Sequence, residues 1–337
     1  LILILPLTAL LLSVCGLTVS TSDTASTGGA ADGGIFRSLN QGGNWEQKAL
    51  IKAVGQPRSF AGINIISLVM DPSDSKAIYA GSLENGLFYS YDGAESWQQS
   101  VSLGKVSVTD VAIDPLNKCV VYVAVANKVF KSSDCSRTWA GIYFDNDLKV
   151  KINSIAIDQA TGKNIFMGAS WRVVERVNSQ IEKIAVNPVD VKIMFAGTTN
   201  KGVYRSTDGG EKWESLADSI KSFNNSTRFR DLAMLKSEKS TVFLATNYGL
   251  LKSTNAGSSW TDIQLITPEK EAKINSIAVN PGNANELYYT TDTTFYRSLD
   301  GGKNWTSKKL PTNRAGWKLL LDPKNPNIIY LAARALK

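Results

Sequence analysis

The chain has 337 residues, a formal net charge of +7 and no histidine. Within this chain, the lack of histidine excludes Ser-His-Asp and Cys-His catalysis and any metal or haem site that needs a histidine ligand. The lysines and arginines are scattered and match no nucleic-acid-binding motif. We therefore expect no nucleic-acid partner and attribute the charge to a solvated basic surface, which weakly favours acidic partners.

An apolar stretch opens the chain, since residues 1–17 read LILILPLTALLLSVCGL. This length is short for a membrane span and suits the hydrophobic region of an export signal. Leu12-Ser13-Val14-Cys15-Gly16 resembles a bacterial lipoprotein cleavage box, although a residue smaller than Val14 usually precedes the cysteine. We expect lipidation of Cys15, with an ordinary cleaved signal or an uncleaved anchor as alternatives. Residues 18–32 then form a flexible tether, and the protein is a membrane-anchored lipoprotein of the bacterial cell envelope, on its periplasmic or extracellular side.

Six copies of one pattern recur along the rest of the chain: Ser-x-Asp/Asn-x-x-x-x-Trp, usually with Gly four residues after the Ser. In such a box the Asp or Asn side chain accepts backbone hydrogen bonds in its own turn, Gly permits a positive φ, and Trp packs on a neighbouring strand. Six near-identical side chains spaced along a repeat cannot share one active site, so we interpret them as structural rather than catalytic or metal-binding. The acid or amide positions are Asn40, Asp92, Asp134, Asp208, Asn255 and Asp300, and the Trp positions are Trp45, Trp97, Trp139, Trp213, Trp260 and Trp305.

A second pattern lies between the boxes: an apolar triplet, then in most copies an Asp-Pro or Asn-Pro turn, then an apolar strand. Its triplets begin at residues 68, 111, 155, 184, 232, 277 and 319. Four short β-rich runs per unit, with a period of about 40–50 residues, predict an all-β propeller. We expect seven four-stranded blades in residues 33–337, one of them shortened near 152–180 where the box is missing. One composite blade joins both ends of the chain.

The boxes resemble Asp-box, or BNR-like, repeats, which sialidases, xyloglucanases, sortilin-type receptors and photosystem II assembly factors all carry. A single propeller with Asp-Pro and Asn-Pro turns is most similar to the photosystem II stability/assembly factor-like group, over about residues 33–337. This resemblance implies an exported, often lipid-anchored scaffold that binds other proteins without catalysis. We expect a monomer with a protein or peptide partner near the membrane and no cofactor or metal.

The candidate binding surface is one mouth of the central channel, where the inner strands start and the loops between second and third strands gather. Trp171 and Trp317 are the only tryptophans outside the boxes, and both map to this face beside basic residues. Aromatic and arginine clusters anchor many protein interfaces, although either Trp can instead simply fill space in its blade. The candidate residues are Trp171, Arg172, Lys183, Lys201, Arg230, Tyr248, Trp317 and Lys318.

The alternative function is a carbohydrate-active enzyme or a glycan-binding propeller. A glycosidase needs two carboxylates about 5–10 Å apart, and Asp110, Glu182 and Asp231 are candidates, although each can equally line the channel in salt bridges. The sialidase signature is absent, since Phe229-Arg230-Asp231-Leu232 does not match Phe-Arg-Ile-Pro. Asp32-Gly33-Gly34 resembles a xyloglucanase segment, but those enzymes place their cleft between two propellers. We therefore predict a protein that is not an enzyme.

Two further cysteines occupy turns of a single unit. Cys119 follows the Asp114-Pro115 turn, and Cys135 lies in the third box. Both turns emerge at the same end of a blade, and an exported compartment permits disulfides. We predict a Cys119–Cys135 bond.

Overall fold

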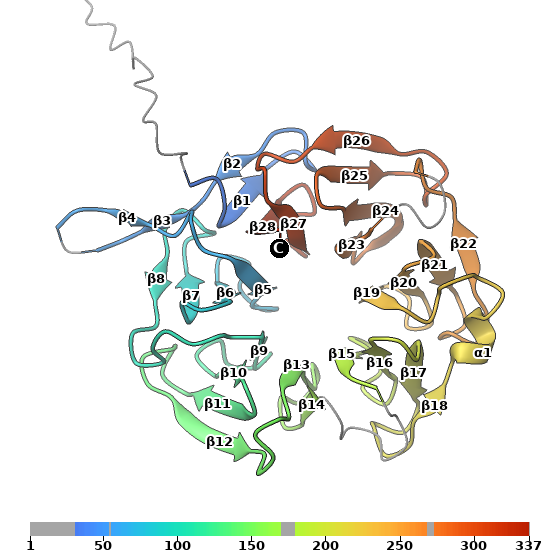
Figure 1. Ribbon diagram of the computed structural model, residues 1–337, viewed down its shortest axis with the longest axis horizontal. Coiled ribbons are helices and arrows are strands. Elements are labelled where there is room, and N and C mark those ends of the chain that lie inside the picture. Colours follow the sequence, from blue (N-terminus) through green and yellow to red (C-terminus); the bar gives the residue numbers. More distant parts are fainter. Residues whose placement is uncertain (1–30, 54, 170–178, 268–272, 337) are drawn as a thin grey trace, which may run out of the picture. The chain divides into compact units, whose positions relative to one another are not determined.

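Short antiparallel strands follow one another around a ring (Figure 1). The computed structural model describes residues 31–53, 55–169, 179–267 and 273–336. In these ranges one short helix, α1 (Ala217–Ile220), interrupts the strands. The ranges contain no helix with the length and apolar character needed to span a membrane.

Six sheets of four strands radiate from the centre of the ring as blades, each with one strand beside the central channel and three further out (Figure 1). Neighbouring strands within a blade run antiparallel. From the inner to the outer strand, the blades are β27 (Ala315–Leu321), β28 (Ile329–Arg334), β1 (Ile35–Ser38), β2 (Glu46–Gln47); β5 (Ile65–Met70), β6 (Ile78–Ser82), β7 (Leu87–Ser90), β8 (Gln98–Gln99); β9 (Asp110–Ile113), β10 (Val121–Val125), β11 (Lys128–Ser132), β12 (Ala140–Phe144); β15 (Ile181–Val186), β16 (Met194–Thr198), β17 (Val203–Ser206), β18 (Glu214–Ser215); β19 (Phe229–Met234), β20 (Val242–Thr246), β21 (Leu250–Ser253), β22 (Thr261–Ile263); and β23 (Ser276–Asn280), β24 (Asn283–Thr290), β25 (Thr294–Ser298), β26 (Thr306–Lys309).

The prediction of seven blades is wrong, because the described residues form six. The seven apolar triplets do form seven inner strands, but the one at 155 belongs to a two-stranded sheet, β13 (Ile152–Ile157) and β14 (Ile165–Ala169). This sheet packs between the blades of β9 and β15. The sequence after β14 has no box, and a box turn connects the third strand to the fourth in every four-stranded blade. Counting triplets therefore overestimated the number of blades.

The composite blade joins strands from opposite ends of the described chain. β1 pairs with β28 in a register that runs from Ile35 opposite Ala332 to Ser38 opposite Ile329. This pairing closes the ring without leaving a long unpaired strand edge at the seam.

A second two-stranded sheet, which the sequence did not predict, follows β2. It consists of β3 (Leu50–Ile51) and β4 (Arg58–Ser59) and extends outward from the ring (Figure 1). Ile51 also forms a parallel bridge with Trp97. The hairpin thus covers part of the outer edge of the β5–β8 blade.

The hydrophobic core lies between neighbouring blades. Phe195 on β16, for example, shares a cluster with Leu232 and Leu244 of the next blade. The second strand of a blade is covered on both faces, so β6 buries all five of its residues. Such strands are apolar throughout instead of alternating, and each large side chain buried in this way contributes roughly 1.5–3 kcal/mol.

The box turns share one hydrogen-bond pattern. In all six boxes the Ser Oγ accepts the backbone N–H four residues later at 2.8–2.9 Å. In the second box, Asp92 Oδ1 also accepts the N–H of Ser96 at 2.9 Å. Burial would raise the pKa of Asp92, but hydrogen bonds from Ser96 and Ser90 outweigh it and lower this pKa to about 2. The repeated Ser and Asp/Asn therefore stabilise the turn itself.

The box tryptophans join a turn to its surroundings. Trp97 is fully buried and donates its Nε1–H to the Lys48 carbonyl at 2.8 Å. Trp139, Trp260 and Trp305 also donate to oxygen atoms outside their boxes, whereas Trp213 donates to the Gly210 carbonyl of its own box at 3.0 Å. Trp45 lacks a hydrogen-bond partner among the described residues and packs edge-on against Phe295, with ring centres 5.4 Å apart.

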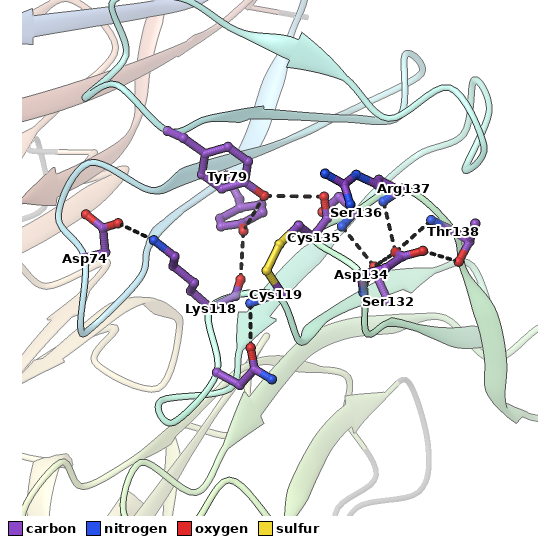
Figure 2. The surroundings of a disulfide bond; sticks show 12 residues. Asp74, Tyr79, Lys118, Cys119, Ser132, Asp134, Cys135, Ser136, Arg137 and Thr138 are labelled. Atoms are coloured by element: carbon purple, nitrogen blue, oxygen red, sulfur yellow. Dashed lines mark hydrogen bonds and ion pairs between the residues drawn. A yellow bond between two sulfur atoms is a disulfide. The ribbon is translucent and has the colours of Figure 1, made fainter.

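A disulfide joins Cys119 to Cys135, the pair predicted from the sequence (Figure 2). The cysteine backbones also pair, since Cys135 N–H donates to the Cys119 carbonyl at 3.1 Å. In this box Cys135 and Ser136 take positive φ values of 60° and 67°. Every other box has Gly at one or both of these positions, so the cross-linked turn is the one in which positive φ is least favourable.

Candidate functional site

Two stacked rings of side chains line the central channel, and both follow from the apolar triplets. The upper ring consists of the residue directly before each triplet, and it is polar. The lower ring consists of the middle residue of each triplet, which is alanine in five copies. The upper ring contains Ser67, Asp110, Ser154, Lys183, Asp231, Ser276 and Lys318, which all line one cavity.

Asp110 in the upper ring connects three inner strands. Its Oδ1 accepts the Ser67 hydroxyl at 3.0 Å. Its Oδ2 accepts the Ser154 hydroxyl at 2.9 Å and the Ile155 N–H at 3.0 Å. All of these donors lie on β5 or β13, so the carboxylate holds neighbouring parts of the ring together.

Asp231 has the same role on the other side of the channel. Its side chain is buried and accepts the Lys183 ammonium at 2.6 Å, the Ser276 hydroxyl at 3.0 Å and the Ile277 N–H at 3.0 Å. Burial would raise the pKa of Asp231, but the charges of Lys183 and Lys318 outweigh it and lower the pKa to about 2. This carboxyl is therefore ionised at neutral pH and cannot donate a proton in acid catalysis.

The upper cavity measures about 620 Å³ and has an excess of positive charge. Its lining includes three acids, two of them the engaged Asp110 and Asp231. The third, Glu182, is exposed and accepts the Thr199 hydroxyl at 2.6 Å. The basic side chains in the lining are Lys183, Arg228, Arg230, Lys318 and Arg334.

Two arginines in this cavity are held by their neighbours. Arg230 donates its Nε–H to Asn247 Oδ1 at 2.7 Å. The Arg334 guanidinium lies 4.2 Å from the ring centre of Trp317, a stacked cation–π contact. Burial lowers the pKa of both arginines, yet an arginine stays charged at neutral pH. The cavity thus presents fixed cations to an anionic group.

The lower cavity, at the other end of the channel, is apolar. It measures about 370 Å³, and the small side chains of the lower ring, such as Ala112, Ala156 and Ala185, line it. Lys183 lines both cavities. The polar ring therefore separates a cationic mouth from an apolar one.

The structure places half of the predicted binding residues together. Lys183, Arg230, Trp317 and Lys318 all line the upper cavity. Lys201 is exposed in the β16–β17 loop, outside the lining. The Tyr248 ring packs on Phe223, with ring centres 5.2 Å apart. Trp171, Arg172 and the predicted lipidation site Cys15 lie outside the described residues.

Sequence reasoning missed Arg228 and Arg334. Arg228 is two residues before Arg230, and side chains two apart in an extended segment share one side, a signal that was available. Arg334 is the last residue of β28, opposite Ala315. An alignment restricted to the starts of inner strands and the loops could not find it.

Asp32, the acid of the xyloglucanase-like segment, also forms contacts with neighbouring residues. Asp32 accepts the Asn313 N–H at 2.8 Å and lies 3.5 Å from Arg314 Nε. The Asn313 hydrogen bond lowers its pKa. Across the part of the chain that the structure describes, no three His, Cys, Asp or Glu side chains are grouped to hold a metal ion.

Comparisons with known proteins agree on the fold. Residues 163–315 match the family model of the photosynthesis system II assembly factor YCF48. The structure of YCF48 with a bound D1 peptide matches with a TM-score of 0.58 at 14% identity, over 80% of this chain and 93% of the other. The GH74 enzyme of Niastella koreensis matches with a TM-score of 0.63 at 18% identity, over 86% of this chain and 53% of the other.

Curated relatives are xyloglucanases. Xgh74A of Acetivibrio thermocellus is 25% identical over 169 residues, 44% of this chain and 19% of the enzyme. A xyloglucanase of Paenibacillus is 24% identical over 273 residues, 71% of this chain and 26% of the enzyme. The chain thus spans 19% and 26% of the length of these two relatives. Residues 163–315 thus match the assembly-factor family, and the chain shares the propeller fold of the solved structures.

Proposed function

We propose that this protein is a non-catalytic, assembly-factor-like propeller that binds a segment of a partner polypeptide at its cationic channel mouth. The observation that carries the proposal is the upper cavity, in which five basic side chains face three acids. Asp110 and Asp231 are fully used in holding the ring, so the free charge is positive. A pocket of this size with few, fixed polar groups suits a short peptide segment that carries carboxylates.

A peptide is the favoured ligand because YCF48, to which the chain is related, has been solved with a D1 peptide bound. The stacked Trp317 and Arg334 supply the kind of rigid aromatic and arginine anchors that dominate protein interfaces.

Binding of acidic peptides tests this proposal. We expect a fluorescein-labelled Glu-Ala-Glu-Ala-Glu peptide to bind, and its Gln-substituted analogue to bind more weakly. Arg230→Glu and Lys318→Glu should each weaken binding by about tenfold or more, because each puts a like charge in the cavity. Lys201→Glu, outside the cavity, is the matched control. Equal affinity of both peptides, or equal loss in the control, would contradict the proposal.

A carbohydrate-active propeller is the second candidate, favoured by the matches to xyloglucanases. Against hydrolysis stand the engagement of Asp32, Asp110 and Asp231 and the low pKa of Asp231. Incubation with xyloglucan heptasaccharide and tamarind xyloglucan tests for hydrolysis. Release of reducing ends that Glu182→Gln abolishes would establish that the protein is a glycosidase.

We further propose that the protein is exported and anchored in the cell envelope through a lipid on Cys15. The apolar residues 1–17 and the cleavage-box resemblance support this, and the disulfide fits an oxidising compartment. Metabolic labelling with an alkyne fatty acid should mark the protein and leave Cys15→Ser unlabelled. Labelling that survives the substitution would contradict the anchor.

A further inference from the structure

Strand β12 differs from the other five outermost strands of the blades. All five of its residues, Ala140-Gly-Ile-Tyr-Phe144, are exposed. The Ile142 and Phe144 side chains remain 47% and 49% exposed. The other outer strands have two to four residues, and their exposed positions carry Glu, Gln, Ser, Thr, Asp or Lys.

An exposed apolar edge is a strand-pairing site, because its outward N–H and C=O groups remain available. Short length and charged residues normally protect such an edge, and β26, with Lys308 and Lys309, follows this rule. Among the described residues β12 pairs only with β11. Its neighbour in the ring is the two-stranded sheet β13–β14, which has no described outer strand to lie beside it (Figure 1).

The chain directly after β12 supplies negative charge and a hollow. A surface cavity of about 430 Å³ is lined by residues 143–147, which include Phe144, Asp145 and Asp147. Asp145 accepts the Tyr143 hydroxyl at 3.1 Å, and Asp147 accepts the Lys149 N–H at 2.9 Å. Asp145 is buried, and its other oxygen accepts the Asp147 N–H at 2.9 Å. Asp147 is exposed and is therefore the acid that a cation can reach.

The same hollow has an aromatic wall that already attracts a cation. Lys128 Nζ lies 5.4 Å from the centre of the Phe144 ring. Carboxylates combined with an aromatic face are the complement of a lysine or arginine side chain.

We propose that β12 is a docking edge for an extended segment of a partner protein. The segment adds antiparallel to β12 as a fifth strand and places a Lys or Arg at its own N-terminal end in the acidic hollow. Antiparallel addition brings that end beside Phe144, where the hollow lies. Backbone pairing supplies affinity, and the cation fixes the register of the added strand. The site differs from the channel mouth, which carries the opposite charge.

A designed strand peptide, acetyl-Arg-Val-Thr-Val-Thr-Val with a C-terminal fluorescein, tests this edge. Fluorescence anisotropy should detect binding, and hydrogen exchange of the amides of Ala140–Phe144 should slow when the peptide is added. Ile142→Lys and Asp147→Lys should each weaken binding by about tenfold. Ser307→Lys, a matched charge on outer strand β26, should leave it unchanged, as should Arg230→Glu in the channel mouth. Circular dichroism verifies that each variant is folded.

Three outcomes would overturn the proposal. One is the absence of binding up to about 1 mM peptide. Another is equal affinity for a peptide that begins with Glu in place of Arg, or unchanged affinity of Ile142→Lys. The third is a dimer, detected by light scattering, that Ile142→Lys dissociates and the peptide does not. In that case a second copy of this chain occupies the edge.

Discussion

The box turns and the upper channel ring both recur in successive units of the propeller, yet they differ in how they use the repeat. In each box the Ser hydroxyl accepts a backbone N–H of its own turn, so the same Ser and Asp/Asn recur with the same hydrogen bonds. Each ring residue faces other units, and it is Ser, Asp or Lys. Asp110 and Asp231 therefore join neighbouring inner strands. The backbone N–H groups that donate to a box acid lie instead in its own turn.

This difference separates structure from function along one chain. Positions whose partners lie in their own turn repeat closely. Positions whose partners lie in neighbouring units vary and include both acids and lysines, and the arginines beside them give the channel mouth its excess of positive charge. The predictions that follow test whether the two classes of position respond as differently as this comparison requires.

Replacing a ring carboxylate should cause the largest loss of stability. Asp231→Ala leaves Lys183 without its counter-ion and the Ser276 hydroxyl and Ile277 N–H without their acceptor. We expect a loss of about 3 kcal/mol in the free energy of unfolding, measured by urea denaturation. Glu182 is an exposed acid that directly precedes Lys183. Glu182→Ala should change the free energy of unfolding by less than about 0.5 kcal/mol. Similar losses in both variants would contradict the structural role of Asp231.

Removing the disulfide should be nearly as costly and should reveal the unfavourable box turn. Cys119 and Cys135 are 16 residues apart, so Cys119→Ser/Cys135→Ser should lose about 3 kcal/mol. Cys119→Ser/Cys135→Gly should lose about 1 kcal/mol less, because Gly adopts the positive φ of residue 135 freely. Thermal denaturation without reductant compares the two pairs, and equal melting temperatures would show that this turn is not strained.

A single box acid should matter less than a ring acid. Asp92→Ala removes the acceptor of the Ser96 N–H and hydroxyl and should cost about 1–2 kcal/mol. Asp208→Ala should cost less, since Asp208 lacks such a side-chain donor at Lys212. If either loss exceeds that of Asp231→Ala in the same urea assay, the ranking of ring above box is wrong.

Acid sensitivity should be the smallest effect, and it should depend on which boxes carry Asp. Hydrogen bonds lower the pKa of Asp134 and Asp300 to about 2 from an ordinary value of 3.8. A lowered pKa stabilises the fold above about pH 4, and this stabilisation is lost as the pH falls towards 2. The melting temperature of Asp134→Asn/Asp300→Asn should therefore fall less between about pH 6 and pH 3 than that of the natural chain. An equal or larger loss would contradict the lowered pKa values.

The sequence was sufficient wherever a structure is local. The box hydrogen bonds and the Cys119–Cys135 disulfide involve motifs whose geometry a short pattern specifies. The pairing of β1 with β28 is not local, but the repeat predicted it because each of these strands needs the other to complete a four-stranded blade. The number of blades was wrong because a triplet specifies an inner strand only, and a box turn, which connects the third strand to the fourth in each four-stranded blade, is missing after β14.

Features that depend on neighbouring units could not be read from the pattern. Lys201 is exposed in its loop and Tyr248 packs on Phe223, so neither lines the upper cavity. The exposure of β12 could not be read from its residues either. Its apolar sequence alone is equally compatible with a buried strand.

The central claim is that the channel mouth binds anions through the basic side chains of its lining, while the boxes only hold the fold. Anisotropy of the Glu-Ala-Glu-Ala-Glu peptide with two variants, Arg230→Glu and Asp92→Asn, tests it most directly. We expect about tenfold weaker binding for Arg230→Glu and unchanged binding for Asp92→Asn. Unchanged binding for Arg230→Glu, or an equal loss in both variants, would contradict the claim.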